Sequence, residues 1–360
     1  MSLLSIQAGS KALAHIREQG LTPSHINTIF GASGAAKWLA IYGLDRAIFS
    51  HWLNPQQLAP EQTIKLFGTS VGAFKLAAAC HDHSADALDH LSHAYIHQSY
   101  PQGVGADEIA QEFKEVQDAV MGGDKIEQIL SHPYLRFSCG AVRCHGGLAS
   151  KNIKRQAASC VKASLKNLQG RHALTKQLDR IVFHDPRETF SIQSRDGYHT
   201  ESVALQADNF LPALTASGSI PVYMHGVEDI AGAGRGMYRD GGLLDYHPVP
   251  GNFWDDEGLV LYPHFYPDCK VGWFDKYLPW RKADASLLKQ AIMIGPSEKF
   301  WAMTELGRVP DRKDFMTYQK NDAERIRLWQ EVADLSLKLG EEFLEMSERG
   351  DWQQVQPLHQ

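Results

Sequence analysis

The segment Gly68–Gly72 places a serine between two glycines, after a β-branched apolar run and before an alanine-rich stretch. A serine on a tight strand-to-helix turn can present its hydroxyl as a nucleophile, and flanking glycines remove side chains that would collide. The pentapeptide alone also arises by chance, so its position between a predicted strand and a predicted helix gives it weight. Ser70 is therefore the candidate nucleophile, with Gly68 and Gly72 as its elbow.

A second small-residue segment, residues 31–36, follows a predicted strand and opens into a helical pattern. Backbone N–H groups at the start of a helix have no partner within it and can stabilise developing negative charge. A P-loop is not matched, because Trp38 rather than Ser or Thr follows Lys37, and the glycine spacing does not fit the dinucleotide fingerprint. Close helix–strand packing is the structural alternative. The segment predicts an oxyanion-binding loop formed by Gly31, Ala32, Ser33 and Gly34.

A carboxylate that could act on Ser70 is Asp240, which is followed by two glycines. An Asp-Gly-Gly sequence is typical of a turn, so Asp240 is a candidate only if the fold brings it to Ser70. His247 follows in the same segment and would complete a Ser-Asp-His triad in the chain order of α/β-hydrolases. The chain has 17 histidines, so such a match is easily obtained, and the triad stays an alternative.

Two other groups have spacings that could bind a metal. Four side chains share one face of a predicted helix, and two cysteines stand close to a histidine. A solvated helix face is the ordinary interpretation of the first group, and reduced thiols fit five scattered cysteines better than a disulfide framework. We expect no metal site at either group, whose members are Asp86, His90, His93 and His97, and Cys139, Cys144 and His145.

The elements that must position these residues alternate between strand and helix. Strand, tight turn and helix follow one another twice, which predicts an α/β sheet with functional loops at the strand ends. Apolar and β-branched runs predict strands over residues 25–30, 63–67, 135–138, 180–184 and 259–262. Helical periodicity predicts helices over residues 10–19, 73–80, 85–98, 106–121, 150–168 and 314–347, and a further one through Trp38 and Leu44.

Taken together, the motifs resemble those of the patatin-like phospholipases, a family of lipid acyl hydrolases with a Ser–Asp dyad. The block from Ala216 to Tyr223 is similar to the family's A-S-x-S-x-P followed by an aromatic residue. Two positions depart from the pattern: Lys37 stands one place late after a loop without three adjacent glycines, and Tyr246 stands where the family often has Asn. The matches, in the family's order, are the loop from Gly31 to Lys37, Gly68–Gly72, the block from Ala216 to Tyr223, and Asp240–Gly242 ahead of Pro248.

The resemblance implies a three-layer α/β fold with a central, mostly parallel sheet, helices on both faces and a C-terminal helical extension. Residues 1–310 would form the hydrolase domain, and residues 311–360 would pack on it. The resemblance also implies that Asp240 accepts the proton of Ser70, that the Gly31 loop stabilises the oxyanion and that an acyl-enzyme forms without metal or cofactor. The expected substrate is a lipid ester of unspecified class. A non-catalytic lipid or acyl-chain carrier is the alternative from another class of protein.

The composition narrows the expected partners. A net charge of −6 gives no electrostatic reason to expect nucleic acid as a partner. The N-terminus lacks the basic and apolar regions of a signal peptide, and no run is long enough to span a bilayer. We therefore expect a cytoplasmic protein whose contact with a membrane would be peripheral, and the sequence leaves its oligomeric state open. The aromatic residues between positions 253 and 280 are predicted mainly to fill the core, the rim of a lipid-binding cleft being the alternative.

Overall fold

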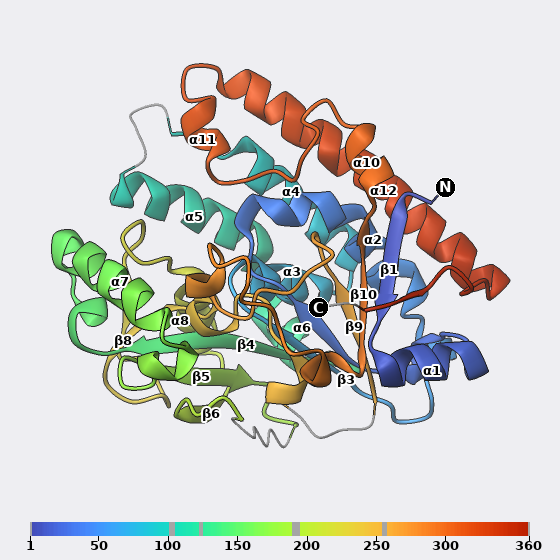
Figure 1. Cartoon of the computed structure of the whole chain (residues 1–360), viewed down its shortest axis with the longest axis horizontal. Coiled ribbons are helices and arrows are strands. Elements are labelled where there is room, and N and C mark those ends of the chain that lie inside the picture. The colour runs from blue at the N-terminus through green and yellow to red at the C-terminus, as the bar shows by residue number, and fades with distance from the viewer. Residues whose placement is uncertain (1, 101–104, 122–124, 189–194, 254–257, 359–360) are drawn as a thin grey trace.

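The computed structural model of the chain describes residues 2–100, 105–121, 125–188, 195–253 and 258–358. Its described strands form one sheet, which runs through the middle of the molecule with helices around it (Figure 1). The order along the sheet is β11-β1-β10-β9-β2-β3-β4-β5-β6, with β8 on β4 and β7 on β8. The strands are β1 Leu4–Ala8, β2 Ile26–Gly31, β3 Ile64–Gly68, β4 Leu135–Cys144, β5 Leu178–His184, β6 Thr200–Ala204, β7 Val227–Glu228, β8 Met237–Asp240, β9 Leu259–Pro263, β10 Ala291–Pro296 and β11 Gln356–Pro357.

The centre of the sheet is parallel. Of the ten strand pairings among the described residues, six are parallel, and these include the continuous run β10-β9-β2-β3-β4. Gly31 at the end of β2 pairs with Gly68 at the end of β3, and Gly68 pairs with Cys139 of β4. In a parallel sheet the loops after neighbouring strands begin at the same edge. The register therefore places the two small-residue loops next to each other.

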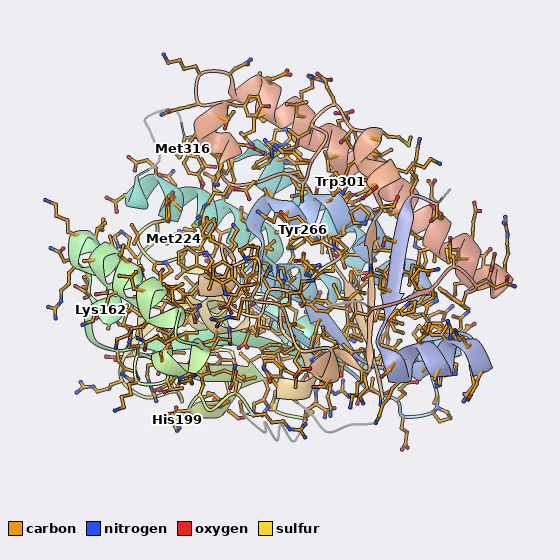
Figure 2. The ribbon with its side chains drawn as sticks, in the orientation of Figure 1. Lys162, His199, Met224, Tyr266, Trp301 and Met316 are labelled. Carbon is orange, nitrogen blue, oxygen red and sulfur yellow. The ribbon has the colours of Figure 1, made fainter. Side chains whose placement is uncertain are left out.

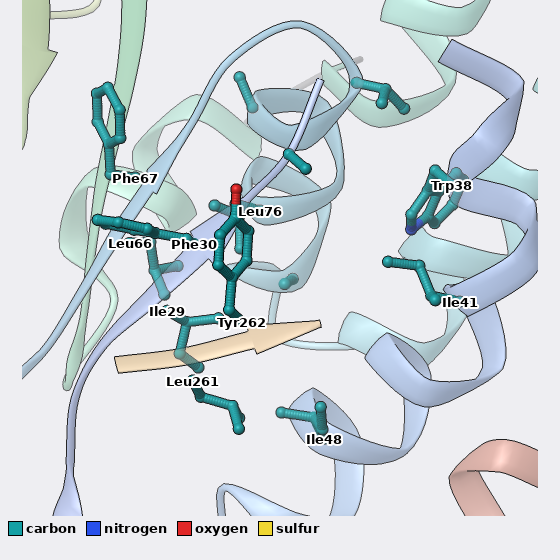
Figure 3. Packing of buried hydrophobic residues seen from close by; sticks show 14 of the residues in the cluster. Ile29, Phe30, Trp38, Ile41, Ile48, Leu66, Phe67, Leu76, Leu261 and Tyr262 are labelled. Atoms are coloured by element: carbon teal, nitrogen blue, oxygen red, sulfur yellow. The ribbon is translucent and has the colours of Figure 1, made fainter. Parts of the chain in front are cut away.

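Side chains pack on both faces of the sheet, because successive residues of a strand point to opposite sides. On β4, Phe137 contacts Phe210 at the start of helix α8, with ring centroids 5.4 Å apart. Val142, on the opposite face, belongs to a second cluster with Cys160 and Ala163 of helix α7. The larger apolar core includes residues of β2, β3 and β9, where Phe30 lies edge-on to Phe67 and Tyr262 (Figure 3).

The helices differ in length and in how they begin. The first predicted helix after β2 is a 3₁₀ helix, η2 Ala35–Ile41, which continues into an α-helix. The C-terminal helix packs on that α-helix so closely that a Cβ on Gly43 would overlap the backbone at Leu337. The α-helices are α1 Ser10–Gln19, α2 Tyr42–Ala47, α3 Val71–Ala79, α4 Ser84–His97, α5 Ala106–Met121, α6 Lys125–Ser131, α7 Ile153–Asn167, α8 Phe210–Gly218, α9 Gly242–Asp245, α10 Glu298–Ala302, α11 Asp314–Thr317 and α12 Asp322–Arg349.

The α/β class, the mostly parallel sheet and the long C-terminal helix are confirmed, and several boundaries differ. The helical pattern over residues 314–347 is divided into α11 and α12, because the Asn321 side chain accepts the Glu324 N–H and starts a new helix. Strands β1, β6, β7, β8, β10 and β11 were not predicted, and β8 carries Asp240 at its end. No described helix is both long and apolar enough to cross a bilayer. The division into residues 1–310 and 311–360 stays a prediction.

Candidate active site

Ser70 stands on a strained turn between β3 and α3. Its φ and ψ angles are 54° and −133°, in the region that residues with a side chain rarely occupy. Ser70 lies just after the end of β3, where it lines a cavity although its side chain is largely buried. The backbone at Ser70 thus makes the strained strand-to-helix turn that the sequence predicts.

The glycines around Ser70 allow three backbone segments to meet. A Cβ on Gly72 would overlap the carbonyl group of Gly31, and a Cβ on Gly31 or on Gly68 would lie 2.5 Å from the backbone of Gly72. No side chain fits at such distances. The first turn of α3 therefore lies directly against the end of β2, and the elbow and the predicted oxyanion loop are positioned by the same contact.

Asp240 reaches Ser70 from β8, which lies on the same edge of β4 as β3, while β5 occupies the other edge. It ends β8, which pairs antiparallel with β4, Asp240 lying opposite Ala141. The end of α8 holds both candidate residues: the Ser217 carbonyl accepts the Ser70 N–H at 3.0 Å, and the Ser219 carbonyl accepts the Asp240 N–H at 3.0 Å. The Ser-x-Ser block thus acts as a backbone brace between Ser70 and Asp240.

The Ser70 and Asp240 side chains line the same cavity, and hydrogen bonding with Ser70 is one of the interactions that lower the pKa of Asp240. Oδ1 of Asp240 also accepts the Gly242 N–H at 2.7 Å. Burial raises the pKa of Asp240 to about 7, and these hydrogen bonds and the charge of Arg312 only partly oppose the shift. A carboxylate with this pKa is ionised in part at neutral pH and is a far better base than an ordinary aspartate.

The loop after β2 also lines this cavity, but only with residues at the C-terminal end of the loop. Ser33 and Gly34 line the cavity with Ala35, whereas Gly31 and Ala32 do not. The Ser33 N–H donates to the Tyr246 carbonyl at 2.8 Å and is already used. The N–H groups of Gly34 and Ala35 precede the first hydrogen bond of η2, from Lys37 to Gly34, and so have no partner within that helix.

The Asp-Gly-Gly turn is fixed by close packing and by side-chain hydrogen bonds. A Cβ on Gly241 would overlap the Gly140 carbonyl, and a Cβ on Gly242 would lie 2.6 Å from Oγ of Ser33. The Thr69 hydroxyl donates to the Asp245 carbonyl at 2.7 Å, which ties the elbow to the segment after the turn. The sequence signals this turn, but its contact with the oxyanion loop arises only in the fold.

Ser70 lies where two arms of one cleft meet. The smaller, polar arm encloses about 520 Å³ and contains the Ser70 and Asp240 side chains together with Lys37 and Lys276. The larger arm encloses about 1140 Å³ and is mainly apolar; Figure 2 labels two of its residues, Met224 and Met316. Its other apolar lining side chains include Val71, Phe74, Tyr95, Ile109, Phe113, Ile220, Tyr223, Tyr277 and Phe315.

Residues that the sequence did not single out complete this cleft. Lys276 follows the short helix η8 Trp273–Asp275, and Asp311 and Arg312 precede α11. Asp311 forms an ion pair with Lys37, and this pair and neighbouring groups lower the pKa of Asp311 to about 2 despite its burial. No local motif marks these residues, because their segments meet the dyad only in the folded chain.

The alternative third member of a triad, His247, does not line either arm of the cleft. Its Nδ1 accepts the Lys270 N–H at 2.9 Å, and its ring packs against Tyr246 and His264. Burial keeps the pKa of His247 well below its ordinary value, with His264 adding to the shift. The ring is therefore neutral and engaged in the core, away from the Ser70 hydroxyl.

The two groups that the sequence raised as metal candidates lie apart from the cleft. His93 and His97 stack on α4 with ring centroids 3.9 Å apart, and Nδ1 of His97 is bonded to the His93 carbonyl. His145 is bonded to Asp179 at 2.8 Å, while Cys144 is buried in the second core cluster. Among the described residues, the group with metal-ligand geometry is a different one: His247, His264 and Cys269.

The aromatic residues after the dyad divide between core and surface. Phe253, Phe265 and Phe274 are buried, as expected for core residues. Trp273 lines the polar arm, and Tyr277 lines the apolar arm with 67% of its surface exposed. Trp280 is 69% exposed, and Trp254 lies outside the described residues.

Comparison with known proteins reveals a distant structural likeness. No protein-family model matches the chain. No curated protein matches its sequence. The structure is similar to the crystal structure of VipD from Legionella pneumophila, with 12% sequence identity and a TM-score of 0.32, over 73% of this chain and 53% of VipD. The chain thus spans about half the length of VipD. A likeness this distant does not define the chemistry of the site.

Proposed function

We propose that this protein is a serine hydrolase that cleaves carboxylic esters of lipids, with Ser70 as nucleophile and Asp240 as general base. The observation that carries the proposal is that Ser70 and Asp240 line one cavity together and that Ser70 also lines the adjoining apolar cavity. The raised pKa of Asp240, about 7, supports it, because it gives the carboxylate the basicity that proton transfer from a serine requires.

The first half of the reaction forms an acyl-enzyme. Oγ of Ser70 attacks the ester carbonyl carbon while its proton moves to the carboxylate of Asp240. The negative charge on the carbonyl oxygen is stabilised by the N–H groups of Gly34 and Ala35, which face the cavity without a partner in η2. The bond to the leaving alcohol then breaks, and the alcohol oxygen takes the proton from Asp240.

The second half returns the enzyme to its starting state. Asp240 accepts a proton from a water molecule, whose oxygen attacks the acyl carbon. The bond to Oγ of Ser70 breaks, and Ser70 recovers a proton from Asp240, leaving a free carboxylic acid. Asp240 thus exchanges one proton in each half, and neither half needs a histidine or a metal ion.

The apolar arm supports a lipid as the source of the acyl group. Aromatic and aliphatic side chains line most of this arm. Ser70 is among its lining residues, so a chain lying in this arm would present its ester carbonyl to Oγ. Burial of each methylene would contribute about 0.8 kcal/mol. Longer esters should therefore react faster until the arm is filled.

The deciding experiment is labelling with a fluorophosphonate probe, together with hydrolysis of p-nitrophenyl esters of increasing chain length. Wild type should be labelled and should prefer long acyl chains. Ser70→Ala and Asp240→Asn should lose labelling and turnover while keeping the wild-type circular dichroism spectrum. Full activity of Ser70→Ala would overturn the proposal. An inert wild type that still binds fatty acid would favour the acyl-chain carrier instead.

We also infer that the substrate is met at a lipid surface. Tyr223, Tyr277 and Met316 line the apolar arm and are 41%, 67% and 72% exposed, so the entrance of the arm is apolar. Aromatic side chains of this kind are favourable at the membrane–water interface. Co-sedimentation with vesicles tests this: Tyr277→Ala and Trp280→Ala should weaken binding, and unchanged binding by both variants would contradict it.

A further inference from the structure

Cationic side chains from three separate parts of the chain converge on the polar arm of the cleft. They are Lys37 in η2, Lys276 after η8, and Arg312 before α11. The carboxylates that line this arm, within the described residues, are Asp240 and Asp311. Because the chain as a whole carries a net charge of −6, this local excess of cations is not a reflection of composition.

The two carboxylates do not neutralise all three cations. Asp311 is paired with Lys37, and its Oδ1 also accepts the Lys313 N–H at 3.0 Å. Asp240 is the proposed base and is protonated for part of each catalytic cycle. Lys276 and Arg312 form no ion pair with any described carboxylate. Lys276 and Arg312 are therefore available to bind an anionic ligand.

The surroundings of Lys276 and Arg312 are aromatic. The ammonium group of Lys276 lies 5.9 Å from the ring centroid of Tyr246 and 5.7 Å from that of Tyr277. The guanidinium group of Arg312 lies 4.3 Å from the ring centroid of Tyr223. Such contacts hold a cation in place but leave its N–H groups free to donate to an anion.

The position of Lys276 has an electrostatic cost in the absence of a ligand. Burial lowers the pKa of Lys276 to about 8, Lys37 and Arg312 lower it further, and Asp311 opposes them. A bound anion would remove this cost and raise the pKa again. The cleft is therefore complementary to a negatively charged group placed beside both cations.

We propose that Lys276 and Arg312 form a subsite for an anionic group, a phosphate or carboxylate, on the alcohol portion of the ester. The inference rests on the proposed ester hydrolysis. Both cations line both arms of the cleft, so they stand where the polar part of a substrate leaves the apolar arm. With the acyl chain in the apolar arm, the charged group of the alcohol lies between Lys276 and Arg312. The enzyme accordingly prefers acidic lipid esters to neutral ones.

A role of the same cations in stabilising the oxyanion makes a different prediction. The oxyanion forms on every ester, so loss of a cation that stabilises it would slow the hydrolysis of neutral and anionic substrates equally. A subsite for the alcohol portion acts only on substrates that carry the charge. The ratio of kcat/KM for an anionic ester to kcat/KM for its neutral counterpart therefore separates the two roles.

The test compares decanoylglycerol phosphate with decanoylglycerol, both below their micelle concentrations, on the full chain. Wild type should prefer the phosphate ester by at least tenfold. Lys276→Gln and Arg312→Gln should each reduce that preference by about 10- to 100-fold, the range for a lost hydrogen bond to a charged group. The matched control is Lys282→Gln, which removes an exposed charge from the same loop outside the cleft and should keep the preference.

A conservative variant gives a readout that a merely structural role would not move. With Lys276→Arg the charge remains, but a guanidinium group does not lose its proton near pH 8. Wild type should lose its preference for the phosphate ester as the pH rises above about 8, the pKa of Lys276, and Lys276→Arg should keep it. The same decline in both proteins would overturn the role of Lys276.

Two further inhibition experiments distinguish the source of the anion. Competitive inhibition by glycerol 3-phosphate, weakened in Lys276→Gln, supports recognition of a soluble phosphate group. Inhibition only by vesicles that contain phosphatidic acid, again weakened in Lys276→Gln, supports a lipid headgroup. Equal kcat/KM for the two decanoyl esters, with Ser70 still labelled by fluorophosphonate, overturns the subsite but leaves the hydrolase intact. Absence of both labelling and turnover overturns the hydrolase itself.

Discussion

Two groups of buried polar side chains lie on either side of the loop that carries Tyr246. On one side Ser70 and Asp240 line the cleft together. On the other side His247, His264 and Cys269 bring their nitrogen and sulfur atoms within 4.8 Å of one another. By residue type, the second group has the more familiar catalytic and metal-binding side chains.

The difference lies in access and in hydrogen bonds. Nδ1 of His247 accepts a backbone N–H, so the proton of its neutral ring is on Nε2, which then has no lone pair for a metal. Nδ1 of His264 is bonded to the Tyr266 carbonyl at 2.6 Å, and burial lowers the pKa of His264 to about 4. Burial also raises the pKa of the Cys269 thiol. All three groups are neutral at pH 7 and pack as core residues. Asp240, equally buried, differs because a nucleophile and a cavity adjoin it.

The sharpest way to break this comparison is to replace one residue on each side with asparagine. Asp240→Asn should reduce kcat/KM by about 10³-fold or more, because the amide cannot accept the proton of Ser70. His247→Asn keeps an acceptor for the Lys270 N–H and should change kcat/KM by less than about threefold, although it leaves a small cavity. Steady-state kinetics on a long-chain ester measures both. A loss as large in His247→Asn as in Asp240→Asn would restore the triad.

The second prediction concerns pH. The Asp240 carboxylate must be ionised to accept a proton, so kcat/KM should fall about tenfold per pH unit below its pKa of about 7. A profile for a neutral ester between pH 5 and 8 measures the midpoint. Titration near pH 4 instead would mean that the carboxylate is solvated, and the contrast with an ordinary aspartate would disappear.

The same pKa has a consequence for stability. A carboxyl group with a raised pKa in the folded protein stabilises it at low pH, and this contribution is lost as pH rises from the unfolded pKa of about 4 to about 7. Asp240→Asn does not ionise, so its stability advantage over wild type should grow between pH 5 and 7 and then level off. It should reach a few kcal/mol at about 1.4 kcal/mol per pKa unit. Urea unfolding at pH 5 and pH 8 measures the difference, and equal values would contradict the buried site.

A third prediction uses two serines of the α8 block. The Ser217 hydroxyl accepts the Ser70 N–H at 3.1 Å and donates to the Gly140 carbonyl at 2.7 Å, so it braces the elbow. The Ser219 hydroxyl donates to the Thr215 carbonyl within its own helix. Ser217→Ala should reduce kcat about tenfold with little change in KM, and Ser219→Ala should change kcat by less than about twofold. Equal effects would show that the hydroxyl of Ser217 does not position Ser70.

The smallest effect is expected from metal removal. Dialysis against a chelator should leave kcat/KM and the thermal midpoint within error, and added Zn²⁺ should not raise either above the untreated values. The reason is the neutral, hydrogen-bonded state of His247, His264 and Cys269. A fall in the thermal midpoint after chelation, reversed by Zn²⁺, would show that His247, His264 and Cys269 form a structural metal site.

The sequence predicted those parts of the site that depend on local backbone. The Gly68–Gly72 segment turns between a strand and a helix with a positive φ at Ser70, and the two loops lie side by side as the parallel strands require. The role of residues 31–34 in binding an oxyanion stays a prediction, and of these residues only Ser33 and Gly34 line the cavity. The carbonyl of Tyr246 takes the Ser33 N–H, and the free donors move toward Ala35. That shift depends on a partner more than two hundred positions away.

The charged side of the cleft was invisible in the sequence. Lys276, Asp311 and Arg312 lie in segments without a recognisable motif, and they meet Lys37 only when α11 and η8 pack over the sheet. The unpredicted strand β8 is another case. It is four residues long, and pairing with β4 rather than its own periodicity makes it a strand. Such short elements are decided by their neighbours.

The amino-acid sequence by itself determined the elbow, the α/β alternation and the identity of the two residues proposed as a dyad, because small residues and apolar periodicity act locally. Only the tertiary structure decided that Asp240 lies against Ser70, that His247 does not, and that two cations remain free at the mouth of the cleft. These properties depend on burial and on distances between segments far apart in the chain. Burial raises the pKa of Asp240 and lowers that of His247, and no short stretch of sequence contains that information.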